Sequence, residues 1–215
     1  MTSLILKDFY IAKKYYLYLF LFTIVTGICF QLSLSSFMNK GFLTGTMPIM
    51  FSLVIIQTIS VDTNSKWSML AKCLPIPRWK YMASKHVSYL VCIFASALLS
   101  ILLNEMITYI IAGIVIDIKD FIYLLSFGIC FASVYGAFSL PICILVNGNE
   151  ITNTLIGVAM WVPSFYITGW MISGIKTSEN TISRIFILFA FILLLHLATC
   201  FIGVSLLKNK KFIGR

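Results

Sequence analysis

The chain has 215 residues, of which 60% are hydrophobic and 11% charged, with a formal net charge of +9. An ordinary soluble domain is about 45 to 50% apolar and about 25% charged, so a water-soluble fold of this length is excluded. The basic residues form short clusters between long uncharged runs, which argues against a nucleic-acid partner because such binding needs a contiguous basic surface. The composition indicates a membrane protein with lipid as its solvent.

Six stretches are long enough to cross a bilayer. A spanning helix needs about 20 apolar residues, because no water is available to bond its backbone. The predicted spans cover residues 15–38, 42–61, 87–116, 121–146, 151–175 and 182–207. The predicted fold class is therefore all-α, with 1–215 as a single transmembrane domain.

The chain begins with an amphipathic pattern over residues 4–16. Ile5, Phe9 and Ala12 share one helical face and the lysines lie elsewhere, which predicts an interfacial helix before the first span. The apolar stretch that follows is too long for a signal peptide and lacks a small-residue cleavage site. We expect it to be a retained span.

The long gap over residues 62–86 predicts two short helices. Asp62 opens a run of N-cap residues, and Trp67, Leu70 and Leu74 follow at helical spacing, so we expect an amphipathic helix there. Pro75 ends this pattern. A basic interfacial helix that rests on anionic lipid explains the composition equally well.

A second short helix is predicted to start near Pro77 and to lead through Arg78 and Lys85 into the third span. That span covers 87–116, about 45 Å if wholly helical, and exceeds the hydrocarbon thickness. Either it tilts strongly or it breaks at Asn104-Glu105. We favour the break.

The distribution of Lys and Arg predicts the topology. Alternate loops divide these residues twelve to four, and the positive-inside rule places the richer side in the cytoplasm. Both termini and the 62–86 loop are thus predicted to be cytoplasmic. The richer set is Lys7, Lys13, Lys14, Lys66, Lys72, Arg78, Lys80, Lys85, Lys208, Lys210, Lys211 and Arg215, and the other is Lys40, Lys119, Lys176 and Arg184.

Few polar residues in the spans suggest chemistry. His196 lies mid-span, where a neutral imidazole bonded to a neighbouring helix is a better explanation than a proton relay. Glu105 is predicted near the outer boundary, too far in depth from His196 for a shared intramembrane active site. The six cysteines show no CxxC pair, so neither a metal site nor a disulfide framework is predicted.

Several of these residues resemble a known family, the permease subunits of type 2 ATP-binding-cassette (ABC) exporters. They resemble in particular the short six-span bacterial branch that includes exporters of amphipathic peptides. His86 departs from the Tyr common at its position in that branch. The residues that carry the resemblance are Leu6-Lys7-Asp8, Asp62, Trp67, Leu74-Pro75, Arg78 and Lys85.

The resemblance implies an N-terminal elbow helix, a coupling helix between the second and third spans, and re-entrant outer half-helices near the fifth-to-sixth connection. The chain holds no GxxxxGK[ST] motif, so ATP and Mg²⁺ would bind a separate ABC ATPase subunit, with no cofactor here and no catalysis by this chain. Two permease subunits would line an export path across a bacterial cell membrane. The implied ATPase-coupling residues are Asp62, Trp67, Leu70, Leu74, Pro75, Arg78 and Lys85.

The alternatives are stand-alone membrane proteins. A secondary transporter or channel would be expected to show inverted repeats or a series of intramembrane charges. An intramembrane enzyme would need paired catalytic groups at one depth. An immunity protein or membrane chaperone fits the composition as well. No span carries a charge pattern that selects a substrate.

Overall fold

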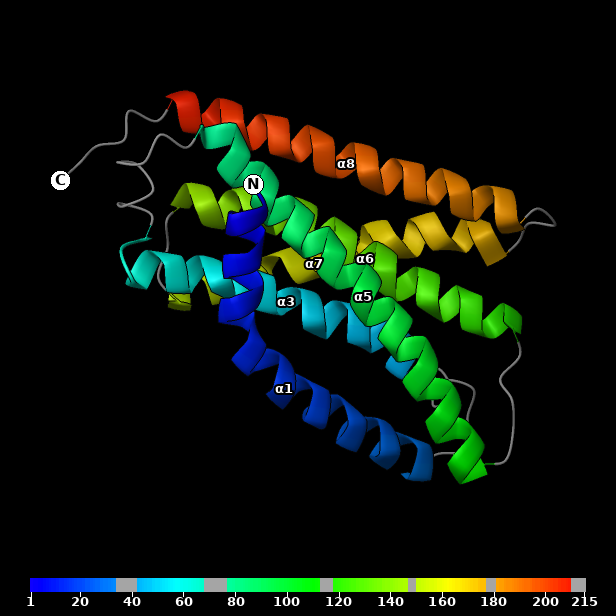
Figure 1. The fold of residues 1–215 in the computed structure, drawn as a ribbon. Helices are drawn as coiled ribbons and strands as arrows, with labels where there is room; N and C mark the ends of the chain where they lie inside the picture. Colours follow the sequence, from blue (N-terminus) through cyan, green and yellow to red (C-terminus); the bar gives the residue numbers. More distant parts are fainter. Residues whose placement is uncertain (34–41, 68–76, 113–117, 147–149, 177–180, 210–215) are drawn as a thin grey trace.

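The computed structural model describes residues 1–33, 42–67, 77–112, 118–146, 150–176 and 181–209. These residues form six helices, each long and apolar enough to cross a membrane (Figure 1). The predicted all-α fold with six spans is confirmed. The helices are α1 (Thr2–Ser33), α3 (Phe42–Asn64), α5 (Arg78–Ala112), α6 (Ile118–Val146), α7 (Glu150–Lys176) and α8 (Thr181–Asn209).

Two predicted helix boundaries are absent from the described chain. Helix α1 runs from Thr2 to Ser33 without interruption, so the interfacial segment and the first span join, and Figure 1 shows that this helix bends. The short helix expected at Pro77 likewise continues into the third span as α5. Its first turn is closed by the Pro77 carbonyl, which accepts bonds from the amides of Lys80 and Tyr81.

The break predicted at Asn104-Glu105 is wrong. Helix α5 continues through both residues to Ala112, and the Asn104 side chain is buried. The physical reason is that α5 contains neither proline nor glycine, the residues at which helices usually kink. At about 1.5 Å per residue the helix exceeds the hydrocarbon thickness, and Figure 1 shows it crossing the bundle obliquely, as the tilted alternative requires.

Within the run of N-cap residues predicted from Asp62 onward, the role is wrong for Asp62 and Asn64. Asp62 and Asn64 belong to the last turn of α3, which ends when Lys66 adopts a left-handed φ of 57°. A left-handed residue just after the last turn is a common helix stop. Trp67 comes next. The predicted Leu70, Leu74 and Pro75 lie outside the described residues.

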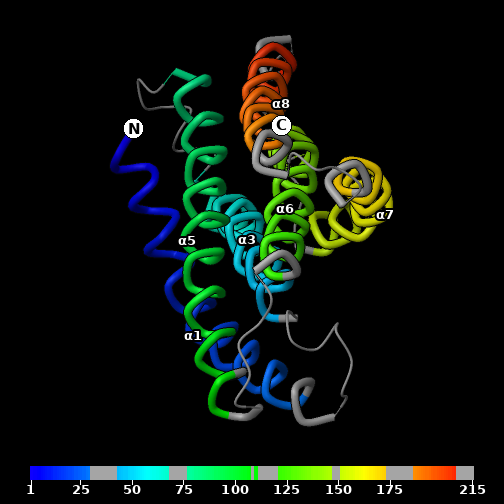
Figure 2. Tube along the Cα trace, turned by 90° about the vertical axis from the view of Figure 1, so that its right-hand side faces the viewer, coloured from blue at the N-terminus to red at the C-terminus, as the bar shows by residue number. Residues whose placement is uncertain are grey.

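Helices α3 and α6 occupy the centre of the bundle, where Figure 2 shows the others placed around them. Their backbones approach closely at Gly45 and Gly128: a Cβ at Gly128 would lie 2.5 Å from the Gly45 carbonyl oxygen. Small residues permit such approaches between membrane helices. The core continues from this contact through Ile55, Tyr89 and Phe131.

The re-entrant half-helices implied near the fifth-to-sixth connection are not found in the described residues. Helix α7 extends unbroken to Lys176 and α8 begins at Thr181. Pro163 lies within α7 without ending it. Both helices carry long uninterrupted apolar runs, which favours full spans over short re-entrant segments.

Candidate functional site

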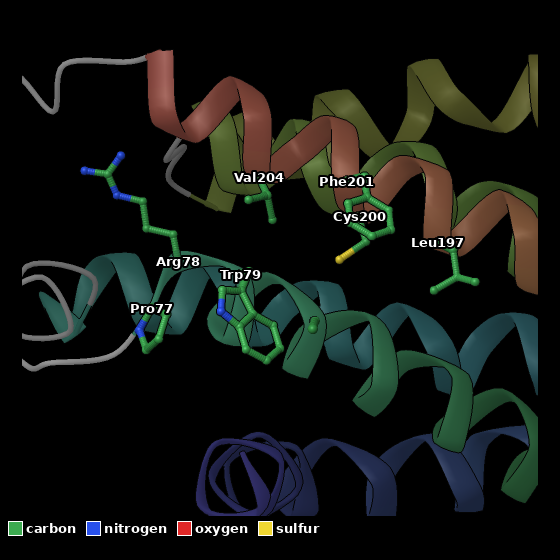
Figure 3. A pocket seen from close by; sticks show the side chains of 8 residues that line it. Pro77, Arg78, Trp79, Leu197, Cys200, Phe201 and Val204 are labelled. Carbon is green, nitrogen blue, oxygen red and sulfur yellow. The ribbon is translucent and has the colours of Figure 1, made fainter.

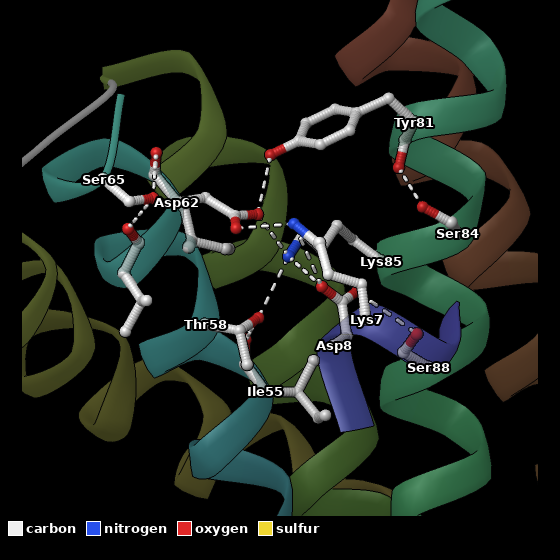
Figure 4. Close-up of polar contacts among 12 residues, drawn as sticks. Lys7, Asp8, Ile55, Thr58, Asp62, Ser65, Tyr81, Ser84, Lys85 and Ser88 are labelled. Carbon is white, nitrogen blue, oxygen red and sulfur yellow. Dashed lines mark hydrogen bonds and ion pairs between the residues drawn. The ribbon is translucent and has the colours of Figure 1, made fainter. Parts of the chain in front are cut away.

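A cluster of four charges joins α1, α3 and α5 at one end of the bundle. Figure 4 shows Lys7 and Asp8 from α1, Asp62 from α3 and Lys85 from α5 meeting there. Lys85 Nζ lies 2.6 Å from Asp8 Oδ1 and 2.8 Å from Asp62 Oδ2, while Lys7 Nζ lies 2.6 Å from Asp62 Oδ1. We call these four residues the charge network. It lies where α3 ends and α5 begins.

Three hydroxyl groups complete the hydrogen bonding of the charge network. Lys85 Nζ donates to Thr58 Oγ1 at 3.0 Å, one turn before Asp62 on α3. The Tyr81 hydroxyl donates to Asp62 Oδ2 and the Ser88 hydroxyl to Asp8 Oδ2, both at 3.4 Å. Residues 81, 85 and 88 share one face of α5 because their spacings are four and three.

The charge network is nearly closed to its surroundings. The side chains of Lys85 and Asp8 are each 1% exposed, Asp62 is 2% exposed and Lys7 is 22% exposed. Two cations balance two anions, so the buried set carries no net formal charge. A buried ion pair adds little net stability over an apolar pair, but the loss of one member leaves an uncompensated charge and is costly. The cluster therefore fixes how α1, α3 and α5 meet.

Trp67 connects the charge network to the loop that follows α3. It is half-buried, and Lys7 Nζ lies 4.7 Å from the centroid of its ring. A cation over an aromatic face is attracted by the ring quadrupole, more strongly where water is excluded. Trp67 is thus held by a cation that also bonds Asp62. A displacement of Trp67 acts directly on the charge network.

The seven residues implied for ATPase coupling fall into three groups. Asp62 and Lys85 are buried in the charge network and bond each other. Trp67 lies beside it, and Arg78 is exposed at the first position of α5. Leu70, Leu74 and Pro75 lie outside the described residues, so their contribution stays a prediction.

Sequence reasoning missed most of the partners in the charge network. Sequence reasoning used Lys7 as a topology signal and, with Asp8, as part of the resemblance, and it did not identify Thr58 or Tyr81. A usable signal was present, since a basic and an acidic residue stand together in α1, one acidic residue stands in the last turn of α3, and several cations stand in the first turns of α5. Charges of both signs at one membrane depth favour pairing.

A histidine pair forms another of the polar contacts between spans. His196 Nδ1 on α8 lies 3.0 Å from His86 Nδ1 on α5, and both side chains are buried. The predicted bond from His196 to a neighbouring helix is confirmed, although His86 was not identified as its partner. Among the described residues, no group of three or more His, Cys, Asp or Glu is placed to hold a metal ion.

Comparison with known families decides what kind of protein carries this arrangement. The sequence profile described as "ABC-2 family transporter protein" matches residues 3–212. The chain belongs to the ABC-2 transporter family. No curated protein and no solved structure matches the chain.

Membership of the ABC-2 family makes this chain a multi-pass membrane component of a transport system. Permeases of the ABC-2 family work with ABC ATPase subunits. The six described spans agree with that role. The charge network then lies at the junction of three spans, next to the loop that follows α3.

Proposed function

We propose that this chain is the permease subunit of an ABC exporter, and that the connection between α3 and α5, within the predicted 62–86 loop, receives the movement of a separate ATPase. One observation carries the proposal: Asp62, at the end of α3, bonds both Lys7 of α1 and Lys85 of α5. A displacement of the loop after Trp67 is therefore transmitted to α1, α3 and α5 together.

The proposal assigns different tasks to the predicted coupling residues. Trp67, with Leu70 and Leu74, contacts the ATPase, the exposed Arg78 lies at the edge of this surface, and Pro75 stiffens the connection. Asp62 and Lys85 are buried, so they act within the permease and keep α3 and α5 moving together. Buried, fully paired groups hold a geometry more rigidly than exposed ones.

Two further features follow from the same proposal. The richer set of Lys and Arg places both termini and the charge network on the cytoplasmic side of a bacterial cell membrane, where ATP is available. A second permease subunit, identical or different, completes the path.

Amphipathic peptides are the proposed substrate class, since they are exported in the branch that the loop resembles. Uptake of a labelled amphipathic peptide into inverted vesicles tests this.

Association with the ATPase tests the proposal. The tagged chain is purified from its native membrane and the accompanying proteins are identified. We expect an ABC ATPase in stoichiometric amount, and we expect Trp67→Ala combined with Leu74→Ala to remove most of it. Trp170→Ala is the matched control, because Trp170 is 81% exposed on α7. Full ATPase recovery with the double variant would rule out this docking site.

A further inference from the structure

An apolar groove lies between the start of α5 and the second half of α8 (Figure 3). Its volume is about 710 Å³, within the range of about 300–1,000 Å³ typical of ligand pockets. Trp79 and Ala83 line it from α5, and Leu197, Cys200 and Phe201 line it from α8. The charge network belongs to another side of α5. This groove is therefore a separate feature.

Several side chains on the walls of the groove are exposed. Leu197 is 57% exposed and Phe201 is 75% exposed, as expected for side chains that contact lipid in a membrane-spanning helix. Trp79 is 53% exposed at the opposite wall. Tryptophan is enriched at the boundary between headgroups and acyl chains, because its ring is apolar and its N–H is polar. The position of Trp79 marks the groove's mouth.

The mouth of the groove is cationic. Arg78 is the first residue of α5, and Figure 3 shows its guanidinium between the start of α5 and the end of α8. Lys80 is exposed one residue beyond Trp79, with its Nζ 5.7 Å from the centroid of the Trp79 ring. None of the described residues that line the groove is acidic. A ligand with an anionic head and an apolar tail matches this arrangement.

We propose that the groove binds one anionic phospholipid of the cytoplasmic leaflet. Its phosphate is bound by Arg78, since the planar guanidinium suits two parallel hydrogen bonds to phosphate oxygens. Its acyl chain lies between Ala83 and Leu197. A second copy of this basic chain is the poorer occupant, because it would bring like charge to the mouth. The leaflet assignment rests on the orientation given under the proposed function.

Lipid binding to the purified full-length chain tests this site. Native mass spectrometry compares dioleoyl phosphatidylglycerol with dioleoyl phosphatidylcholine, which share acyl chains and differ in net charge. We expect phosphatidylglycerol to bind about tenfold more tightly, which corresponds to about 1.4 kcal/mol. Arg78→Gln should remove this preference. Lys13→Gln is the matched control, because Lys13 is an exposed cation on α1.

Two outcomes of this experiment would overturn the site. Equal affinity for the two lipids would show that the groove does not recognise an anionic head. An equal loss in Arg78→Gln and Lys13→Gln would show a general effect of net charge. The measurement uses the permease without an ATPase, so its result does not depend on whether an ATPase associates. A failure of lipid selectivity and a failure of ATPase docking are thus distinguishable.

A second measurement locates the acyl chain. Phosphatidylglycerol with brominated acyl chains quenches nearby tryptophan fluorescence, and we expect Trp79→Phe to remove a quenchable fraction. Ala83→Phe should fill the groove and protect Trp79 from quenching, even if the lipid still meets Arg78. Unchanged quenching in both variants would contradict the assignment. An Ala83→Phe variant that no longer dimerises but keeps its lipid affinity would also contradict the assignment, because the groove would then hold a second copy of the chain.

Discussion

Lys85 is the residue on which the contacts of the charge network converge. It bonds Asp8, Asp62 and Thr58, and its side chain is 1% exposed. Asp62 and Lys85 were identified from the sequence, but as residues that couple to the ATPase and not as buried partners of each other. Their pairing spans 23 positions, and that of Asp8 with Lys85 spans 77. No local pattern predicts which distant charges meet, because that depends on how the helices pack.

Removal of one charge should cost far more than removal of a balanced pair. Lys85→Met leaves Asp8 and Asp62 with only Lys7, so we expect a loss of about 3–5 kcal/mol in unfolding free energy. Lys85→Met combined with Asp8→Asn keeps one cation and one anion. This double variant should recover most of the loss. Denaturant unfolding of the purified protein in detergent measures both.

Lys80→Met is the matched control for this comparison. Lys80 lies on the same helix but is exposed, so its loss should change stability by no more than about 0.5 kcal/mol. A double variant less stable than Lys85→Met alone would show that the charges do not compensate one another. Lys85 would then contribute mainly through packing of its aliphatic stem.

The helices show how far local sequence determines an element. Continuous apolar runs predicted all six spans, and the described residues confirm them. The ends of the helices were harder to predict, because polar residues in the last turn of a helix were interpreted as part of the following loop. Asp62 and Asn64 remain in α3 because the helix continues until Lys66 turns left-handed. At Asn104 burial against neighbouring helices outweighed the tendency of asparagine to interrupt a helix.

The contact between α3 and α6 depends on the absence of a side chain. Gly128→Ala would place a Cβ against the Gly45 backbone, which cannot move aside as a flexible side chain can. We expect a loss of about 1–3 kcal/mol from overpacking. Gly169→Ala on α7 is the matched control, because nothing lies within 4 Å of its added Cβ. It should be neutral or slightly stabilising, as alanine favours helix.

Thermal unfolding of the two variants side by side decides this prediction. Equal midpoints for Gly128→Ala and Gly169→Ala would mean that α3 and α6 separate at no cost. The sequence did not predict this contact. Glycine is common in membrane helices, and its spacing alone does not show which partner helix approaches it.

At the scale of the whole molecule, the charge asymmetry predicts where the bundle ends lie. A green fluorescent protein fused after Arg215 should fluoresce, since it folds in the cytoplasm, whereas alkaline phosphatase there should be inactive. Fusions that end at Lys176, after five of the described helices, should show the opposite pattern. Fluorescence from both fusion sites would contradict the predicted topology.

The class of protein could be predicted from the sequence, whereas the mechanism could not. Composition and span count indicated a membrane domain, and the loop residues indicated the family before the profile match confirmed it. The connection between loop and spans became visible only when Lys7, Asp62 and Lys85 met in space. That connection is the basis for the proposed coupling.

The most direct test of the proposed coupling is ATP hydrolysis by the complex of this chain with the ATPase that we propose as its partner. The rate is compared with that of the same ATPase alone, for the wild type and for Lys85→Met with Asp8→Asn. We predict that the wild-type permease changes the rate, and that the double variant still binds the ATPase but no longer changes it. A double variant that regulates hydrolysis as the wild type does would contradict the coupling role of the charge network.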